Sequence, residues 1–135
     1  TSLPPTEAPA TEEPAPNTAG GGEAVAGDPA NGQTVFTTMH TTASGMWSCA
    51  MCHSVTPDEA RLIGPGLWNI ALHAETRVEG QSAYDYIHES IVAPDVFIAP
   101  GDPPYPAGLM PQNWEEVLTP EELDDVIAYL YTLQD

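Results

Sequence analysis

The chain has 135 residues, a length that suits one globular domain with a tail. Its 20 Asp and Glu residues stand against two Arg and no Lys, so the net charge is −18 at pH 7. This charge excludes nucleic acid as a natural partner and disfavours direct docking on anionic lipid, because both would repel the chain. It favours protein partners with a basic docking face, unless the acidity is a general solubility device or a salt adaptation.

Residues 1–27 have the composition of an extended linker. Five Pro fall within the first 20 residues, and Gly20-Gly21-Gly22 follows. Such a segment buries too little apolar surface to offset its ordering entropy, so we expect a tether ahead of a domain at 28–135. No run approaches the roughly 20 apolar residues of a membrane span. Because the chain begins at Thr1 and not Met, we expect a processed product whose export signal was removed, with any anchor removed too or attached as lipid at the first residue.

A first helix is predicted from Pro29 to about Met39. Asp28 is a typical N-cap, and Pro29 suits the first helical position. Gly32 lies one turn before Phe36 on the same face, where a small residue allows another helix to cross closely. Residues 40–48 are expected to form a loop with a turn near Ser44-Gly45.

The segment Cys49-Ala50-Met51-Cys52-His53 is a C-x-x-C-H motif, which is typical of covalent haem attachment. Two thiols three residues apart can form thioethers with neighbouring vinyl groups on one haem edge, and the following His can bind the iron. A thioredoxin-like redox pair needs a βαβ context that the sequence lacks, and half of a zinc site needs a second Cys pair. A simple disulfide is the remaining alternative.

The segments after the motif are mostly helical or rich in Pro. Gly64-Pro65-Gly66-Leu67 begins about twelve residues in which we expect no strand. A second helix is predicted at 82–92, with Ser82 as N-cap and Pro94 as its stop. Residues 95–112 form a long Pro-rich loop that delivers Met110, and loops of this length are usually functional. Thr119-Pro120-Glu121-Glu122 is a capping box that opens an amphipathic last helix. We therefore predict an all-α domain of three to five helices.

Taken together, residues 27–135 resemble the class I cytochromes c. The motifs occur in the order that is typical of that family: a Gly/Phe first helix, C-x-x-C-H, Gly-Pro-x-Leu, a helix at 82–92, Pro-Gly before Met-Pro, and an amphipathic terminal helix with an aromatic residue. Residues 86–94 (YIHESIVAP), 98–101 (IAPG) and Met110-Pro111 look most like cytochrome c domains of bacterial membrane respiratory complexes, such as alternative complex III.

The resemblance implies one covalent haem c wrapped by the helices, and it implies a role for each matching residue. Cys49 and Cys52 would form the thioethers, and His53 and Met110 would be the proximal and distal iron ligands. The carbonyl of Pro65 would accept a hydrogen bond from His53, and Leu67 would pack on the haem. Gly32 and Phe36 would cross the last helix near Tyr129.

The chain departs from the family pattern at 40–48, which looks like an insertion before the first Cys. Three roles are open for this insertion: it covers one haem edge, it forms a docking surface, or it has no functional role. The ring of Lys that mitochondrial members carry is missing, which again favours a basic partner. Met110 has rivals as distal ligand: the thioethers of Met39, Met46 and Met51, and the imidazoles of His40, His73 and His88.

These features predict an electron-transfer protein and not an enzyme, because six-coordinate His/Met iron leaves no open site for substrate. The linker favours a cytochrome domain that is tethered to, or fixed in, a membrane electron-transport complex. Such a complex would be quinol-oxidising, respiratory or photosynthetic. The domain would lie on the periplasmic or extracytoplasmic face of the membrane. A free periplasmic carrier is the alternative. A haem enzyme or gas sensor with a labile distal Met is the alternative from another class, and a non-haem redox or metal module is a third.

Overall fold

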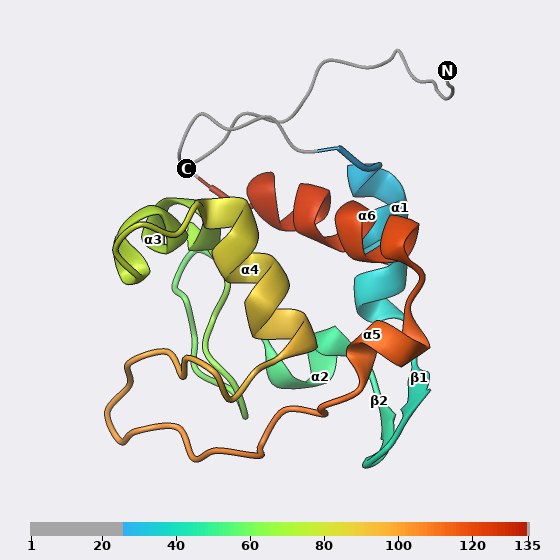
Figure 1. Cartoon of the computed structure of the whole chain (residues 1–135), viewed down its shortest axis with the longest axis horizontal. Helices are drawn as coiled ribbons and strands as arrows, with labels where there is room; N and C mark the ends of the chain where they lie inside the picture. Colours follow the sequence, from blue (N-terminus) through green and yellow to red (C-terminus); the bar gives the residue numbers. More distant parts are fainter. Residues whose placement is uncertain (1–25, 135) are drawn as a thin grey trace.

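A computed structural model describes residues 26–134. The predicted linker at 1–27 lies outside the described residues except for its last two positions. Six helices and one two-stranded hairpin occur between residues 26 and 134 (Figure 1). In chain order they are α1 Pro29–Thr37, β1 His40–Thr42, β2 Gly45–Trp47, α2 Cys49–Cys52, α3 Ile70–Arg77, α4 Ala83–Val92, α5 Trp114–Val117 and α6 Pro120–Tyr131.

The predicted all-α class is confirmed, although the helices number six in this part of the chain and not three to five. Two of them, α2 and α5, are single turns of four residues, too short to give a periodic pattern. The three helix starts that the sequence predicts are confirmed by their caps. Asp28, Ser82 and Thr119 each accept a hydrogen bond from a backbone N–H in the first turn of the helix that follows.

The closest helix crossing joins α1 to α6. A Cβ built on Gly32 would lie 1.9 Å from the carbonyl oxygen of Asp125, so only glycine permits this approach. The Asp125 carboxylate accepts hydrogen bonds from the backbone N–H of Asp28 at 2.7 Å and from the side-chain amide of Asn31 at 2.7 Å. The ring of Phe36 lies 5.5 Å from that of Tyr129, which confirms the predicted crossing.

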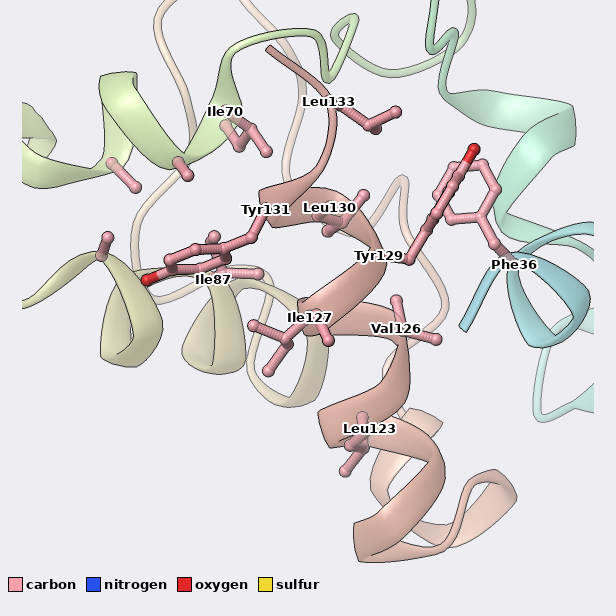
Figure 2. Close-up of a cluster of buried hydrophobic side chains, with 14 of the residues drawn as sticks. Phe36, Ile70, Ile87, Leu123, Val126, Ile127, Tyr129, Leu130, Tyr131 and Leu133 are labelled. Atoms are coloured by element: carbon pink, nitrogen blue, oxygen red, sulfur yellow. The ribbon is translucent and has the colours of Figure 1, made fainter. Parts of the chain in front are cut away.

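The core is built around α6, whose side chains are buried on two sides. Figure 2 shows Tyr129 beside Phe36 of α1, whereas Tyr131 points the other way, toward Ile87 of α4. Because α6 packs against both helices, most of its residues from Leu123 to Tyr131 are buried. This explains why the apolar stripe predicted from the sequence widens toward the end of the helix.

Helix α3 is the one full-length helix that the sequence pattern does not predict. Its N-cap, Asn69, has φ 62° and makes no side-chain cap hydrogen bond, so the usual start signal is missing. Its buried face consists of Ile70, Ala71 and Ala74, which are too few and too small for a clear apolar stripe. The helix is stabilised by packing against α4 instead.

The expectation that residues 40–48 form a loop is wrong, because β1 and β2 pair as an antiparallel hairpin. His40 is opposite Trp47 and Thr41 is opposite Met46. Strands of three residues are too short for an alternating pattern to be read from sequence. The hairpin packs on α5: the His40 ring lies 5.6 Å from that of Trp114, edge to face.

The α4–α5 connection, residues 93–113, contains no helix or strand and sweeps around one edge of the molecule (Figure 1). Near its start the ring of Phe97 lies 5.7 Å from that of Tyr86 on α4. At its end the Asn113 side chain accepts a hydrogen bond from the backbone N–H of Ala43 at 2.9 Å. The hairpin therefore anchors the end of the connection that follows Met110. Within residues 26–134, no helix is long and apolar enough to cross a membrane.

Candidate functional site

A cavity of about 470 Å³ opens between the C-x-x-C-H segment, the α4–α5 connection and the core helices. Its size is within the usual range for small-molecule and cofactor pockets. All the site residues predicted from the sequence line this one cavity: Cys49, Cys52, His53, Pro65, Leu67 and Met110. Its inner wall is formed by core side chains, among them Phe36, Ile87, Val126 and Leu130.

The His53 imidazole is fixed by the segment that follows it. Its Nδ1 lies 2.8 Å from the carbonyl oxygen of Pro65, so Nδ1–H donates and Nε2 keeps its lone pair. Burial lowers the pKa of His53, and the Pro65 carbonyl opposes this only in part. The ring is therefore held in the neutral tautomer that a metal ligand requires, with the second ring nitrogen oriented by a backbone acceptor.

Gly64 makes room for this ring, which leads to a testable prediction. A Cβ on Gly64 would lie 2.7 Å from Cε1 of His53 and 3.1 Å from its Nδ1. Gly64→Ala is therefore expected to tilt the imidazole and weaken its bond to Pro65, with a loss of about 1–3 kcal/mol in stability. Chemical denaturation of the haem-loaded protein measures this loss. Leu62→Ala is the control, since it shortens an exposed side chain two residues earlier in the same segment. Equal losses for the two variants would contradict the steric explanation.

The two thiols are brought together by α2. Ser48 caps this single turn by accepting a hydrogen bond from the backbone N–H of Met51 at 3.2 Å, and the turn places Cys49 and Cys52 on one side. Burial raises the pKa of Cys49 to about 12 and also raises that of Cys52. A redox-active C-x-x-C pair needs the opposite shift, toward a stable thiolate. The thiol environment thus does not fit a thioredoxin-like centre.

Met110 differs from the other methionines in its position. It is half-buried and lines the cavity, whereas Met39, Met46 and Met51 are 46%, 58% and 45% exposed and do not line it. Its backbone carbonyl accepts a hydrogen bond from the side chain of Gln112 at 2.8 Å. Of the three thioethers that the sequence offered as rivals, none shares the cavity with His53.

The rival histidines are less favourably placed than Met110. The Nε2 atom of His40 lies 2.9 Å from the carbonyl oxygen of Val35, and His40 does not line the cavity. His88 also lies outside the cavity lining, and its ring stacks on that of Tyr84 with the ring centroids 5.8 Å apart. His73 does line the cavity, but its side chain is 43% exposed and lies 3.3 Å from the Glu59 carboxylate.

Sequence reasoning missed several cavity residues because the fold, and not a motif, brings them there. Trp47 reaches the lining because it is opposite His40 on the inward face of the hairpin. Trp114 is buried and lines the cavity, and its position four residues after Met110 is the one signal that the sequence offers for it. Tyr105 lines the cavity from the Pro-rich connection, where no periodicity orders the side chains.

A small helical domain with a C-x-x-C-H motif in the wall of an apolar cavity defines a c-type haem protein. The family model described as Cytochrome c matches residues 29–134, and the chain belongs to this family. Searches of curated proteins and of solved structures returned no significant match. The chain is therefore a haem-based electron carrier that attaches haem c covalently through Cys49 and Cys52.

The residues of the cavity fit this group. Haem c supplies a single iron centre that takes up and releases one electron. The inner wall offers aliphatic and aromatic side chains, which exclude water from a large apolar ring. The unprotonated Nε2 of His53 offers a lone pair at the wall that also carries both cysteines.

Proposed function

We propose that His53 and Met110 are the axial ligands and that the chain carries single electrons with both ligands bound in either oxidation state. The observation that supports this most strongly is that one cavity is lined by the C-x-x-C-H segment on one side and by the Met110 loop on the other. A neutral imidazole held by Pro65 and a half-buried thioether suit a low-polarity, six-coordinate site. Unchanged ligation keeps reorganisation small and leaves no position for substrate.

We further propose that the protein acts as a tethered or fixed subunit of a membrane electron-transport complex on the extracytoplasmic face. Two features support this: the linker-like composition of residues 1–27, and the likeness of residues 86–94, 98–101 and Met110-Pro111 to cytochrome c domains of bacterial respiratory complexes. Covalent haem c is fitted outside the cytoplasm, which supports this location. A free periplasmic carrier is the alternative, because the same domain would transfer electrons without a tether.

The charge of the chain supports a partner with a basic docking face. Residues 29–57, which include the hairpin and both cysteines, contain no Asp, Glu, Lys or Arg, so the acidic groups of the domain lie elsewhere along the chain. α6 and α5 each carry two acidic residues in the first turn. The uncharged segment lines the cavity through Trp47, Cys49 and Cys52, and the two acidic helices pack against its elements, α5 against β1 and α6 against α1. This arrangement suits electrostatic steering by a basic partner, with apolar contact close to the electron path.

Membrane fractionation tests the proposed subunit role. Membranes from the native source are solubilised in mild detergent, and the haem-stained chain is followed through affinity purification and size exclusion. We expect the chain to co-migrate with subunits that oxidise a quinol, and electron transfer with its partner to slow as ionic strength rises. Recovery in the soluble extracytoplasmic fraction, as a monomer active with a soluble donor, would support the free carrier instead.

A further inference from the structure

Arg61 links the two loops that bear the proposed iron ligands. It is one of two cationic side chains apart from histidine in the sequence, and it follows the C-x-x-C-H segment. Its guanidinium carbon lies 3.9 Å above the centroid of the Tyr105 ring, and its Nη1 donates a hydrogen bond to the carbonyl oxygen of Pro103. Arg61 and its two partners are more than 40 residues apart in sequence.

The base of Arg61 is held on the His53 side of the cavity. Ser54 donates a hydrogen bond to the carbonyl oxygen of Ala60 at 2.6 Å, and the Gly64 N–H donates to that of Cys52 at 2.7 Å. The short segment that carries Arg61 is therefore closed back onto the haem-attachment motif at both ends. A group that contacts Arg61 is therefore held to the side of the cavity that carries His53.

The other side of the contact belongs to the connection that carries Met110. Tyr105 lines the cavity, as do the neighbouring residues Pro106, Leu109 and Met110. Gly101 lies beneath the Tyr105 ring: its added Cβ would be 2.5 Å from Cε2 of that ring and 3.3 Å from Nη1 of Arg61. The absence of a side chain at Gly101 therefore leaves the space that the Tyr105 ring and the Arg61 guanidinium occupy.

The connection is anchored near its ends by Phe97 against Tyr86 and by Asn113 against Ala43. The 15 residues between those two anchors include Met110, and the contacts of Arg61 fall near their middle. The Gly108 N–H also ties this segment back to the start of the connection, because it donates a hydrogen bond to the Asp95 carboxylate at 2.9 Å. The contacts of Arg61 add an anchor to the opposite wall of the cavity, which leaves the segment fewer open conformations.

We propose that Arg61, Tyr105 and the Pro103 carbonyl form a clamp that keeps the Met110 loop closed over the cavity, so that Arg61 is a positioning residue for Met110. The clamp rests on the proposed axial role of Met110 and adds to it a control over how often the thioether leaves the iron. An external ligand binds only while the loop is open, so its apparent affinity is proportional to the open fraction.

Imidazole binding to the oxidised protein tests the clamp. Imidazole is small and can bind uncharged, so a change in protein charge does not steer it. In Arg61→Gln we expect imidazole to bind about tenfold more tightly, a change of about 1.4 kcal/mol, because the variant loses the cation–π contact and the charged hydrogen bond. Carbon monoxide should bind the reduced variant faster by a similar factor. Leu62→Gln, at an exposed neighbouring position, should match the wild type.

A double-mutant cycle separates the clamp from a general loosening of the fold. Tyr105→Leu and Arg61→Gln should each raise imidazole affinity, and the double variant should bind no more tightly than either single one. Gly101→Ala, which displaces the Tyr105 ring, should act in the same direction.

Two results have different meanings. If the wild type resists imidazole and Arg61→Gln resists it equally, or if the effects of the two substitutions add, the clamp is wrong and the axial role of Met110 stands. If the wild type binds imidazole freely, Met110 does not hold the iron, and the proposed ligand set and the clamp are both wrong.

Discussion

Met110→Ala is expected to leave haem c covalently attached while it opens the iron and lowers the reduction potential by about 0.1–0.3 V. The thioether is a weak donor that favours reduced iron, and axial ligation sets haem potentials over a range of about 0.8 V. Both cysteines and His53 are untouched by the substitution and lie on another segment of the cavity wall. Attachment and the proximal bond should therefore survive.

Potentiometric titration, visible spectra and carbon monoxide binding measure the effect of Met110→Ala. We expect a lower midpoint, a changed oxidised spectrum and rapid carbon monoxide binding, with haem staining on a denaturing gel unchanged. Met46→Ala is the matched control, because that thioether is 58% exposed and outside the cavity lining. An unchanged potential and spectrum would show that another group binds the iron.

The same experiment distinguishes an electron carrier from a haem enzyme or gas sensor. A sensor would bind carbon monoxide readily with Met110 in place, and the substitution would add little. A carrier resists carbon monoxide until the thioether is removed. The half-buried position of Met110 in the cavity wall favours the second behaviour.

Features that depend on a few neighbouring residues could be predicted from the sequence. The caps at Asp28, Ser82 and Thr119 are local hydrogen bonds between a side chain and the next turn, and all three occur. The contact between His53 and Pro65 was expected from their matching motifs, and the structure contains it at 2.8 Å. The resemblance that these motifs carry implies one shared haem site, and the predicted site residues all line one cavity.

Features that depend on tertiary contacts could not be predicted in this way. Helix α3 lacks a side-chain cap and is stabilised by its contact with α4. The hairpin at 40–47 has strands of three residues and is stabilised by the contact between His40 and Trp114. The stacking of Arg61 on Tyr105 joins positions 44 residues apart, both in segments without periodicity. No local pattern encodes such contacts.

Gly32→Ala is expected to lower the free energy of unfolding by about 3 kcal/mol, although alanine normally favours a helix by about 1 kcal/mol over glycine. The added Cβ would lie 1.9 Å from the carbonyl oxygen of Asp125 and 2.8 Å from Cβ of Tyr129. Because the nearest atoms belong to the backbone of α6, no side-chain rotation relieves the overlap. The two helices must separate, which weakens the contact between Phe36 and Tyr129 and the hydrogen bonds to Asp125.

The loss in Gly32→Ala should extend to the haem cavity, since Phe36 on α1 and both Val126 and Leu130 on α6 line it. Guanidinium unfolding, followed by the haem spectrum, should show a lower midpoint with an unchanged slope. Gln33→Ala is the control: it places alanine at the neighbouring exposed position of α1, where stability should hold or rise slightly. Should Gly32→Ala be as stable as Gln33→Ala, the close crossing of α1 and α6 would not be what holds this domain together.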